Sequence, residues 1–318
     1  MTRLLTALFL VAFAFDFAAG EEAELKILVV VGVGGTDEYE EIFNETAGTW
    51  EKAAARGGAA FQGIGLDEDS DNDAERLREA IASTEAGELW LVLIGHGSFD
   101  GRTAKFNARG PDFTGVELAS WLEDYRGDLS VINTASASGS FIQDLAEPGR
   151  IVITATKNEG EVFFTRFGTY FAEAVAGLPN ADLDNDDQVS LLECFLFASK
   201  RVEEFYEKEG RLATEHALLD DNGDGLASRS EWFEGVTPTR APAEEAEFDG
   251  ERAAQKVLVM NAFERQLTND QRQRRDALEL KVKDLRRARS NLDDSEYYSK
   301  LEELLLELAT IYREADKS

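Results

Sequence analysis

Sulfur, proline, histidine and basic side chains are all scarce in this sequence. It holds one cysteine, five prolines and two histidines, and 33 Lys and Arg residues face 63 Asp and Glu residues. A single cysteine excludes an intramolecular disulfide, so stability must come from the core and from any bound ion. Because Cys194 lies in an apolar run, we expect a buried, unreactive thiol.

The formal net charge of -30 excludes further classes of partner. A surface this acidic would repel both nucleic-acid phosphates and anionic lipid headgroups, so we expect no nucleic-acid partner. The content of hydrophobic residues, 43%, is high enough to build a core, which argues against a globally disordered chain.

The N-terminus has the pattern of a secretory signal peptide. Arg3 precedes an apolar run over 4–15, and the small residues Ala18, Ala19 and Gly20 follow. The run is too short for a membrane span, and no other segment is long and apolar enough. We therefore expect residues 1–20 to be removed and the mature chain, without a membrane span, to be periplasmic or secreted.

Apolar strands alternate with helical patterns over the first half of the mature chain. Strands are predicted at 25–31, 59–66, 89–94, 129–133 and 151–155, and helices at 36–56, 71–83, 113–125, 142–146 and 166–176. This alternation predicts an α/β domain over 21–178, with a mainly parallel sheet flanked by helices. In such sheets ligands gather at the carboxyl ends of the strands.

A dinucleotide site is not expected after the first strand. Gly32 and Gly34 begin a glycine-rich fingerprint, but Asp37 stands where the third glycine belongs. An acidic residue at this helix start would repel a pyrophosphate.

Two acidic segments over 179–236 match the twelve-residue EF-hand loop. In the first, positions 1, 3, 5, 7, 9 and 12 are Asp182, Asp184, Asp186, Gln188, Ser190 and Glu193. In the second, the same positions are Asp220, Asn222, Asp224, Leu226, Ser228 and Glu231. Gln188 and Leu226 would act through their main-chain carbonyls, and the other residues offer side-chain oxygens.

These loops predict two Ca²⁺ ions bound as structural braces at the ends of a shared helix over 190–208. Position 6 is Gly225 in the second loop but Asp187 in the first, where the left-handed bend normally favours glycine. Trp232 and Phe233 are expected to begin an apolar helix after the second loop.

The C-terminal part has a different character. A Pro/Ala/Glu-rich linker over 237–252 leads to residues 253–318, where Thr268 and Gln271 form a predicted capping box. Apolar residues at near-heptad spacing then predict a coiled-coil-like helical hairpin. Residues 257–259 are a candidate edge strand of the main sheet. The hairpin either packs on its own domain or binds a partner.

Two short motifs resemble those of the caspase-like cysteine peptidases, within them the legumain branch. The motifs are LIGHGS at 93–98 and VINTASASGS at 131–140, and the resemblance spans 25–177. It implies that His96 matches the catalytic histidine and Gly97 the oxyanion glycine. Ser136 stands where the family has its nucleophilic cysteine.

The serine leaves three functions open, because a hydroxyl is a much weaker acid than a thiol and needs an oriented base. The chain is a calcium-braced pseudopeptidase that binds peptides or proteins, or a hydrolase with Ser136 as nucleophile and His96 as base. Alternatively, it is a structural protein that recruits partners through its hairpin. The resemblance also implies that residues 156–161 line a specificity pocket, where Glu159 or Glu161 would favour a basic substrate group.

Overall fold

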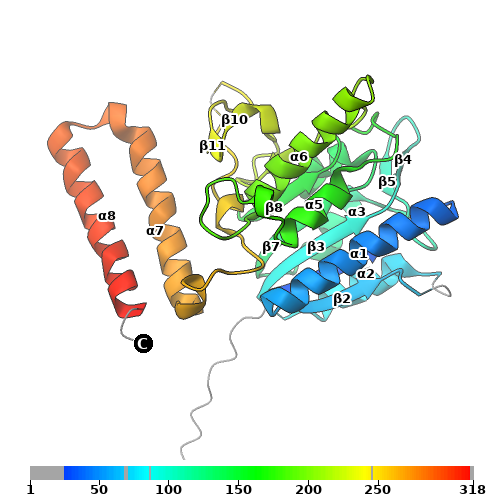
Figure 1. Ribbon diagram of the computed structural model, residues 1–318, viewed down its shortest axis with the longest axis horizontal. Coiled ribbons are helices and arrows are strands. Elements are labelled where there is room, and N and C mark those ends of the chain that lie inside the picture. The colour runs from blue at the N-terminus through cyan, green and yellow to red at the C-terminus, as the bar shows by residue number, and fades with distance from the viewer. Residues whose placement is uncertain (1–24, 68–70, 86, 245, 316–318) are drawn as a thin grey trace, which may run out of the picture.

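The strands of the central sheet form from the apolar, β-branched runs of the sequence. The computed structural model describes residues 25–67, 71–85, 87–244 and 246–315, so the predicted signal peptide lies outside the described residues. The sheet has the order β2-β1-β3-β7-β8-β9, in which the first five strands are parallel and β9 is antiparallel to β8 (Figure 1). Its strands are β1 Leu25–Val31, β2 Ala60–Ile64, β3 Glu88–Ile94, β7 Asp128–Asn133, β8 Arg150–Thr154 and β9 Leu218–Asp220.

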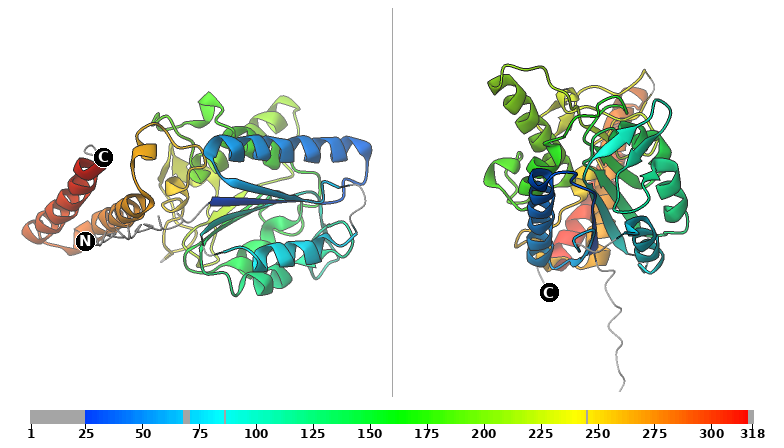
Figure 2. Two further views of the ribbon diagram at one scale, coloured as in Figure 1. Left: turned by 90° about the horizontal axis from the view of Figure 1, so that it is seen from below. Right: turned by 90° about the vertical axis from the view of Figure 1, so that its right-hand side faces the viewer.

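Helices cover both faces of this sheet, as Figure 2 shows most clearly in its left view. One face carries α1 Asp37–Gly57, α5 Phe167–Val175 and α6 Leu191–Lys208, and the other carries α2 Asp73–Ala82, α3 Gly115–Leu122 and α4 Phe141–Leu145. Because alternate side chains of a strand point to opposite faces, Val29 enters the first core and Val30 the second. The predicted α/β class, with a mainly parallel sheet flanked by helices, is confirmed.

A small antiparallel sheet lies beyond the carboxyl end of β3. It consists of β4 Gly97–Phe99, β5 Ala104–Phe106 and β6 Phe113–Thr114. This sheet was not predicted from sequence. The helix expected from residue 113 begins instead at Gly115. Phe113 and Thr114 pair with β5, and Thr114 then caps α3 through a capping box with Glu117.

The sixth strand of the main sheet is β9, and the prediction of an edge strand at 257–259 was wrong. Val257 makes only an isolated bridge to Ser190, and Leu258 is buried against Gly57 at the end of α1. The outer edge of β8 is occupied by Leu218–Asp220. Residues of the region 179–236 therefore belong to the same core as the sheet.

The C-terminal residues form the expected helical hairpin, with α7 Asn269–Arg287 and α8 Asp294–Ala315 (Figure 1). The predicted capping box of Thr268 and Gln271 is present. Leu278, Val282, Leu308 and Ile311 give the hairpin a core of its own. Polar contacts such as the ion pair of Arg287 with Glu251 join it to the rest of the chain.

Shorter elements complete the chain. A hairpin pairs β10 Phe233–Glu234 with β11 Thr237–Pro238, and 3-10 turns lie at Ser138–Ser140, Pro179–Ala181, Ser230–Trp232, Ala253–Gln255, Glu264–Gln266 and Ala288–Asn291. Within the described residues, none of the helices combines the length and the hydropathy needed to cross a membrane.

Candidate functional site

The first acidic loop, 182–193, folds around the carboxylate of Asp182. That carboxylate accepts hydrogen bonds from the backbone N–H groups of Asp186 (3.2 Å) and Asp187 (3.1 Å). The backbone turns through left-handed conformations at Asn185 (φ 63°) and Asp187 (φ 65°). Asparagine and aspartate tolerate this region better than most residues, so the loop bends without glycine.

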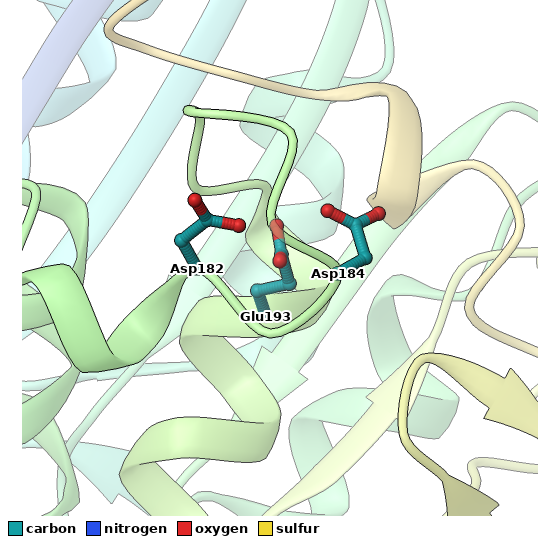
Figure 3. Close-up of side chains that lie close together, drawn as sticks. All are labelled: Asp182, Asp184 and Glu193. Carbon is teal, nitrogen blue, oxygen red and sulfur yellow. The ribbon is translucent and has the colours of Figure 1, made fainter.

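The start of α6 delivers Glu193, the twelfth residue, to the loop interior. Ser190 caps the helix in a capping box with Glu193, whose side chain is buried and also accepts the Leu183 N–H at 2.8 Å. Figure 3 shows Asp182, Asp184 and Glu193 facing one another, and one carboxylate oxygen of each lies within 4.8 Å of the others. Burial, followed by the charges of neighbouring carboxylates, raises the pKa of Asp184.

The remaining expected ligands of the first loop lie close by but are already hydrogen-bonded. The Asp186 carboxylate, which is exposed, accepts from the backbone and side-chain amides of Gln188. The Gln188 side-chain oxygen accepts from the Asn261 N–H, which ties the loop to the segment before the hairpin. The Ser190 hydroxyl is used by the helix cap.

The second loop, 220–231, begins in the same way. The Asp220 carboxylate accepts from the N–H groups of Gly223 (2.8 Å) and Gly225 (2.9 Å), and both glycines are left-handed. These are positions 4 and 6, the positions that are left-handed in the first loop as well. The side-chain oxygens of Asn222 and Asp224 accept from the amides of Asp224 and Leu226. The two loops thus share left-handed backbone at positions 4 and 6 and a first-position carboxylate that accepts the N–H of position 6.

The second loop departs from the first after position 9. Ser228 is buried, but a single 3-10 turn and then β10 follow, so the predicted exit helix from Trp232 was wrong. Phe233 and Glu234 pair with β11 instead of continuing a helix. Glu231 is delivered to the surface, where its side chain is 62% exposed and pairs with Arg229. Within the described part of the chain, no trio of acidic groups like that of the first loop forms here.

Two further carboxylates, those of Asp221 and Asp249, are buried at the second loop, and Asp249 was not predicted from sequence as a site residue. Asp221 accepts the N–H groups of Gly250, Arg252 and Ala253. Asp249, in the predicted linker, accepts the Asp221 N–H through Oδ1. Burial, then the charge of Asp221, raises the pKa of Asp249 to about 8, while the Ser228 side chain lowers it. No spacing pattern marks this aspartate in the sequence.

His96 lies at the carboxyl end of β3 among aromatic rings. Its ring meets those of Tyr39 (4.9 Å between centroids) and Phe43 (5.1 Å) edge-on. Burial lowers the pKa of His96, and a hydrogen bond to the Gly34 backbone partly offsets this. The lowered pKa favours the neutral imidazole, which is the form that a general base needs.

Ser136, in the turn after β7, is buried and bonded to Gly97. Its hydroxyl accepts the Gly97 N–H at 3.0 Å and donates to the Gly97 carbonyl at 3.1 Å. Gly97 is required for this approach, because a Cβ there would lie 2.0 Å from the Ser136 carbonyl oxygen. Among the described residues, no hydrogen bond joins Ser136 to His96. Ala137, the next residue, holds a left-handed backbone (φ 53°), which is uncommon for alanine.

The loop after β8 brings Glu161 and His216 together. Glu161 Oε1 lies 2.5 Å from His216 Nδ1 and 3.3 Å from Lys157 Nζ, so this carboxylate already has cationic and imidazole partners. Glu159, by contrast, is half-buried and lines a cleft of about 650 Å³ together with Ser140 and Asp144. Neither His96 nor Ser136 lines that cleft.

Cys194 takes no part in either site. It lies buried in α6, and burial raises the pKa of its thiol well above the ordinary value. A thiol that is buried and protonated is unreactive, in agreement with the prediction.

Comparison with known proteins gives only distant structural similarity. No protein-family model matches the chain, and no curated protein matches it either. Among solved structures it is similar to caspase-1 from Spodoptera frugiperda, at 10% identity over 63% of this chain and 87% of that chain, with a TM-score of 0.42. The Drosophila initiator caspase Dronc gives 11% over 63% and 80%, with a TM-score of 0.41.

A protein from Geobacter sulfurreducens gives 13% identity over 55% of this chain and 88% of its own, with a TM-score of 0.38. Similarity at this level says nothing about which side chains act in this chain.

Proposed function

We propose that the chain is an exported calcium-binding protein whose caspase- or legumain-like domain binds peptides or proteins rather than cleaving them. The observation that carries the calcium part is the trio of Asp182, Asp184 and Glu193, whose carboxylates face one another in the first loop. The left-handed backbone that the two loops share at positions 4 and 6 adds support.

The chemistry of the loops suits Ca²⁺. The expected donors are all oxygen atoms from carboxylates, hydroxyls, an amide and backbone carbonyls, which is the donor set that a hard cation prefers. Burial, and then the charges of neighbouring carboxylates, raise the pKa of Asp184, so a bound cation would relieve the repulsion there. The first loop leads into α6 and the second begins in β9, so two ions would brace a helix and a sheet edge.

Calorimetry on residues 21–318 tests calcium binding directly. We expect binding heat with dissociation constants of about 10⁻⁴ to 10⁻³ M, the range of extracellular modules. The melting temperature should fall in a chelator and recover with Ca²⁺. Glu193→Gln should weaken one site, whereas Asp187→Asn should not, because its side chain is no ligand. Absence of binding heat at millimolar Ca²⁺ would refute the calcium assignment.

The contacts of Ser136 favour a binding role over hydrolysis. Its hydroxyl bonds to both backbone groups of Gly97, which is also the candidate oxyanion donor. The candidate nucleophile, Ser136, and the candidate oxyanion donor, Gly97, are therefore hydrogen-bonded to each other. The His96 ring instead contacts aromatic side chains and Gly34. Attack by serine needs a base within hydrogen-bond reach.

Labelling with a serine-reactive fluorophosphonate distinguishes the binding module from the hydrolase. We expect no adduct at Ser136 in the wild-type chain, as read by peptide mass spectrometry. An adduct at Ser136 that disappears in His96→Ala would establish the alternative, a legumain-type hydrolase with a Ser136–His96 dyad.

The exposed apolar side chains of α8 support a second role, recruitment of partners by the hairpin. Tyr298, Leu305 and Leu306 are all exposed although they are large and apolar. Light scattering on the wild type and on a Leu305→Glu, Leu306→Glu double variant tests this role. A loss of assembly in the variant supports it, and a wild-type monomer that captures no partner counts against it.

A further inference from the structure

The second calcium loop lacks an inward-facing residue at position 12. In the first loop, α6 begins at once and turns Glu193 into the loop, where it is 3% exposed. In the second loop, the chain enters β10, and Glu231 points to solvent beside Arg229. The loop therefore needs another acidic residue if it is to surround an ion.

Asp249 is placed to be that residue. It is fully buried (0% exposed), although it lies in the segment that was predicted to be a linker. Its Oδ1 accepts the N–H of Asp221, position 2 of the loop. This contact places the Asp249 carboxylate beside the first two residues of the second loop, Asp220 and Asp221.

A reciprocal set of hydrogen bonds fixes Asp249 at the loop. Asp221 accepts from the N–H groups of Gly250, Arg252 and Ala253, and Asp221 in turn donates its own N–H to Asp249. Gly250 is left-handed (φ 101°), and a Cβ there would lie 2.7 Å from the Phe233 ring. The segment after Asp249 is thus locked against the loop and against β10.

Oδ2 of Asp249 is buried and, among the described residues, no donor is aligned with it for a hydrogen bond, although the Ser228 side chain lies near the carboxylate. Nδ2 of Asn222, at position 3, is also buried without a hydrogen-bond partner. Within the described part of the chain, no lysine or arginine forms an ion pair with Asp249. A carboxylate oxygen buried without a donor is costly, and a metal ion is one of the few groups that compensate for it.

We propose that Asp249 completes the second loop as a calcium ligand in place of Glu231. This inference rests on the proposed function, since it presumes that the second loop binds Ca²⁺. It assigns to Asp249 the acidic ligand that the twelve-residue pattern assigns to Glu231. The alternative is that Asp249 is a neutral carboxylic acid with a purely structural role.

Calorimetry on the full mature chain with the first loop silenced tests the assignment. Asp184→Asn and Asp186→Asn alter exposed side chains of the first loop and leave the second untouched. In this background, Asp249→Asn should weaken Ca²⁺ binding at least about tenfold, because one charged ligand is lost. Glu231→Ala should change it by less than about threefold, since that side chain points to solvent.

The outcomes separate this inference from the proposed function. If Glu231→Ala abolishes binding, or if Asp249→Asn leaves it unchanged, the assignment of Asp249 is wrong while calcium binding stands. If the silenced chain binds no Ca²⁺, the second loop is not a calcium site and both ideas fail for it. Because Glu231 is exposed, Glu231→Ala should fold even if Asp249→Asn does not.

A melting experiment supplies a second readout. In a chelator, Asp249→Asn should be at least as stable as the parent chain, because a buried acid without a donor is removed. With millimolar Ca²⁺, the variant should lose most of the rise in melting temperature that the parent shows. An equal rise in both chains would contradict a ligand role for Asp249.

Discussion

At the scale of single residues, Ser136 is the side chain that best distinguishes the proposed binding role from hydrolysis. A thiol at this position would be held as a thiolate by a nearby histidine, whereas the serine hydroxyl bonds to the backbone of Gly97. The Ser136 side chain is thus part of the packing between β4 and the turn after β7.

Ser136→Ala should therefore lower stability. The variant leaves the buried N–H and carbonyl of Gly97 without their partner, which should cost about 1–2 kcal/mol of unfolding free energy. Urea denaturation measures this. The exposed Ser98→Ala is the control and should not differ from wild type. If Ser136→Ala leaves stability intact and instead removes a hydrolytic activity, the serine is a nucleophile.

Glu215 gives the fold a dependence on pH. It is buried beside the start of α5, where it accepts from the N–H groups of Arg166 and Phe167. Burial raises its pKa from 4.5 to about 7, while these donors, Tyr206 and the charge of Arg166 oppose the rise. The folded chain thus holds this proton more tightly than the unfolded chain. The resulting stability is complete below about pH 4.5 and is lost as the pH rises through 7.

Glu215→Gln should remove this part of the pH dependence. Between pH 5 and pH 8 in a chelator, the wild type should lose up to about 3 kcal/mol more unfolding free energy than the variant. Asp249, whose pKa is also raised, is present in both chains and cancels in the difference. The exposed Glu207→Gln should follow the wild type. Parallel pH profiles for wild type and Glu215→Gln would show that Glu215 is ionised throughout.

At the scale of elements, the first acidic loop bends without the glycine that the second loop has. Asp187 at position 6 is left-handed, like Gly225. Asp187→Gly should therefore stabilise the chain by about 0.5 kcal/mol, and Asp187→Ala should destabilise it by about 1 kcal/mol. Thermal melts in saturating Ca²⁺ measure both. The same direction of change in both variants would show that the backbone conformation is not the cause.

The hairpin of α7 and α8 is expected to be an independent unit of stability. Ile311 is fully buried in a core that contains only hairpin and preceding residues. Ile311→Ala should cost the hairpin about 2–4 kcal/mol and should leave the sheet unaffected. Hydrogen exchange should then lose protection over 269–315 only. The exposed Leu306→Ala should change neither region, and a global loss of protection in Ile311→Ala would mean that the two parts unfold together.

The elements that could be predicted from sequence are those with long, uniform patterns. The run at 25–31 is apolar apart from Lys26, and the run at 89–94 is apolar throughout, because both faces of their strands are buried. By contrast, β4, β5, β6 and β9 have two or three residues each, too few to show any periodicity. Asp220 both ends β9 and starts the second acidic loop, so the acidic pattern of the loop makes the strand hard to recognise in the sequence.

The candidate sites were predicted where the spacing itself carries the chemistry. The ligand positions of the first loop could be read from sequence, and the structure brings three of their carboxylates together. Glu231 shows the limit of this reasoning, because its direction depends on β10 and β11 rather than on its place in the loop. Asp249 shows the same limit in reverse, since only the fold brings it to Asp221.

At the scale of the whole molecule, the net charge of -30 should oppose folding when no cation is bound. Raising the NaCl concentration should increase the melting temperature in a chelator, because salt screens repulsion among the carboxylates. The increase should be smaller in saturating Ca²⁺, which neutralises the most crowded groups. Differential scanning fluorimetry measures both series. A melting temperature that salt does not change would show that repulsion is unimportant here.

The position of β9 links the second loop to the border of the central sheet. Asp220 is both the last residue of this strand and the first residue of the loop, so release of an ion there would loosen the strand that covers β8. An uncovered β8 would offer its free backbone groups to any extended segment nearby, including β8 of another molecule. Calcium depletion should then have an effect that depends on protein concentration. At low concentration the chains would only become less ordered at this edge of the sheet, whereas at high concentration they would precipitate.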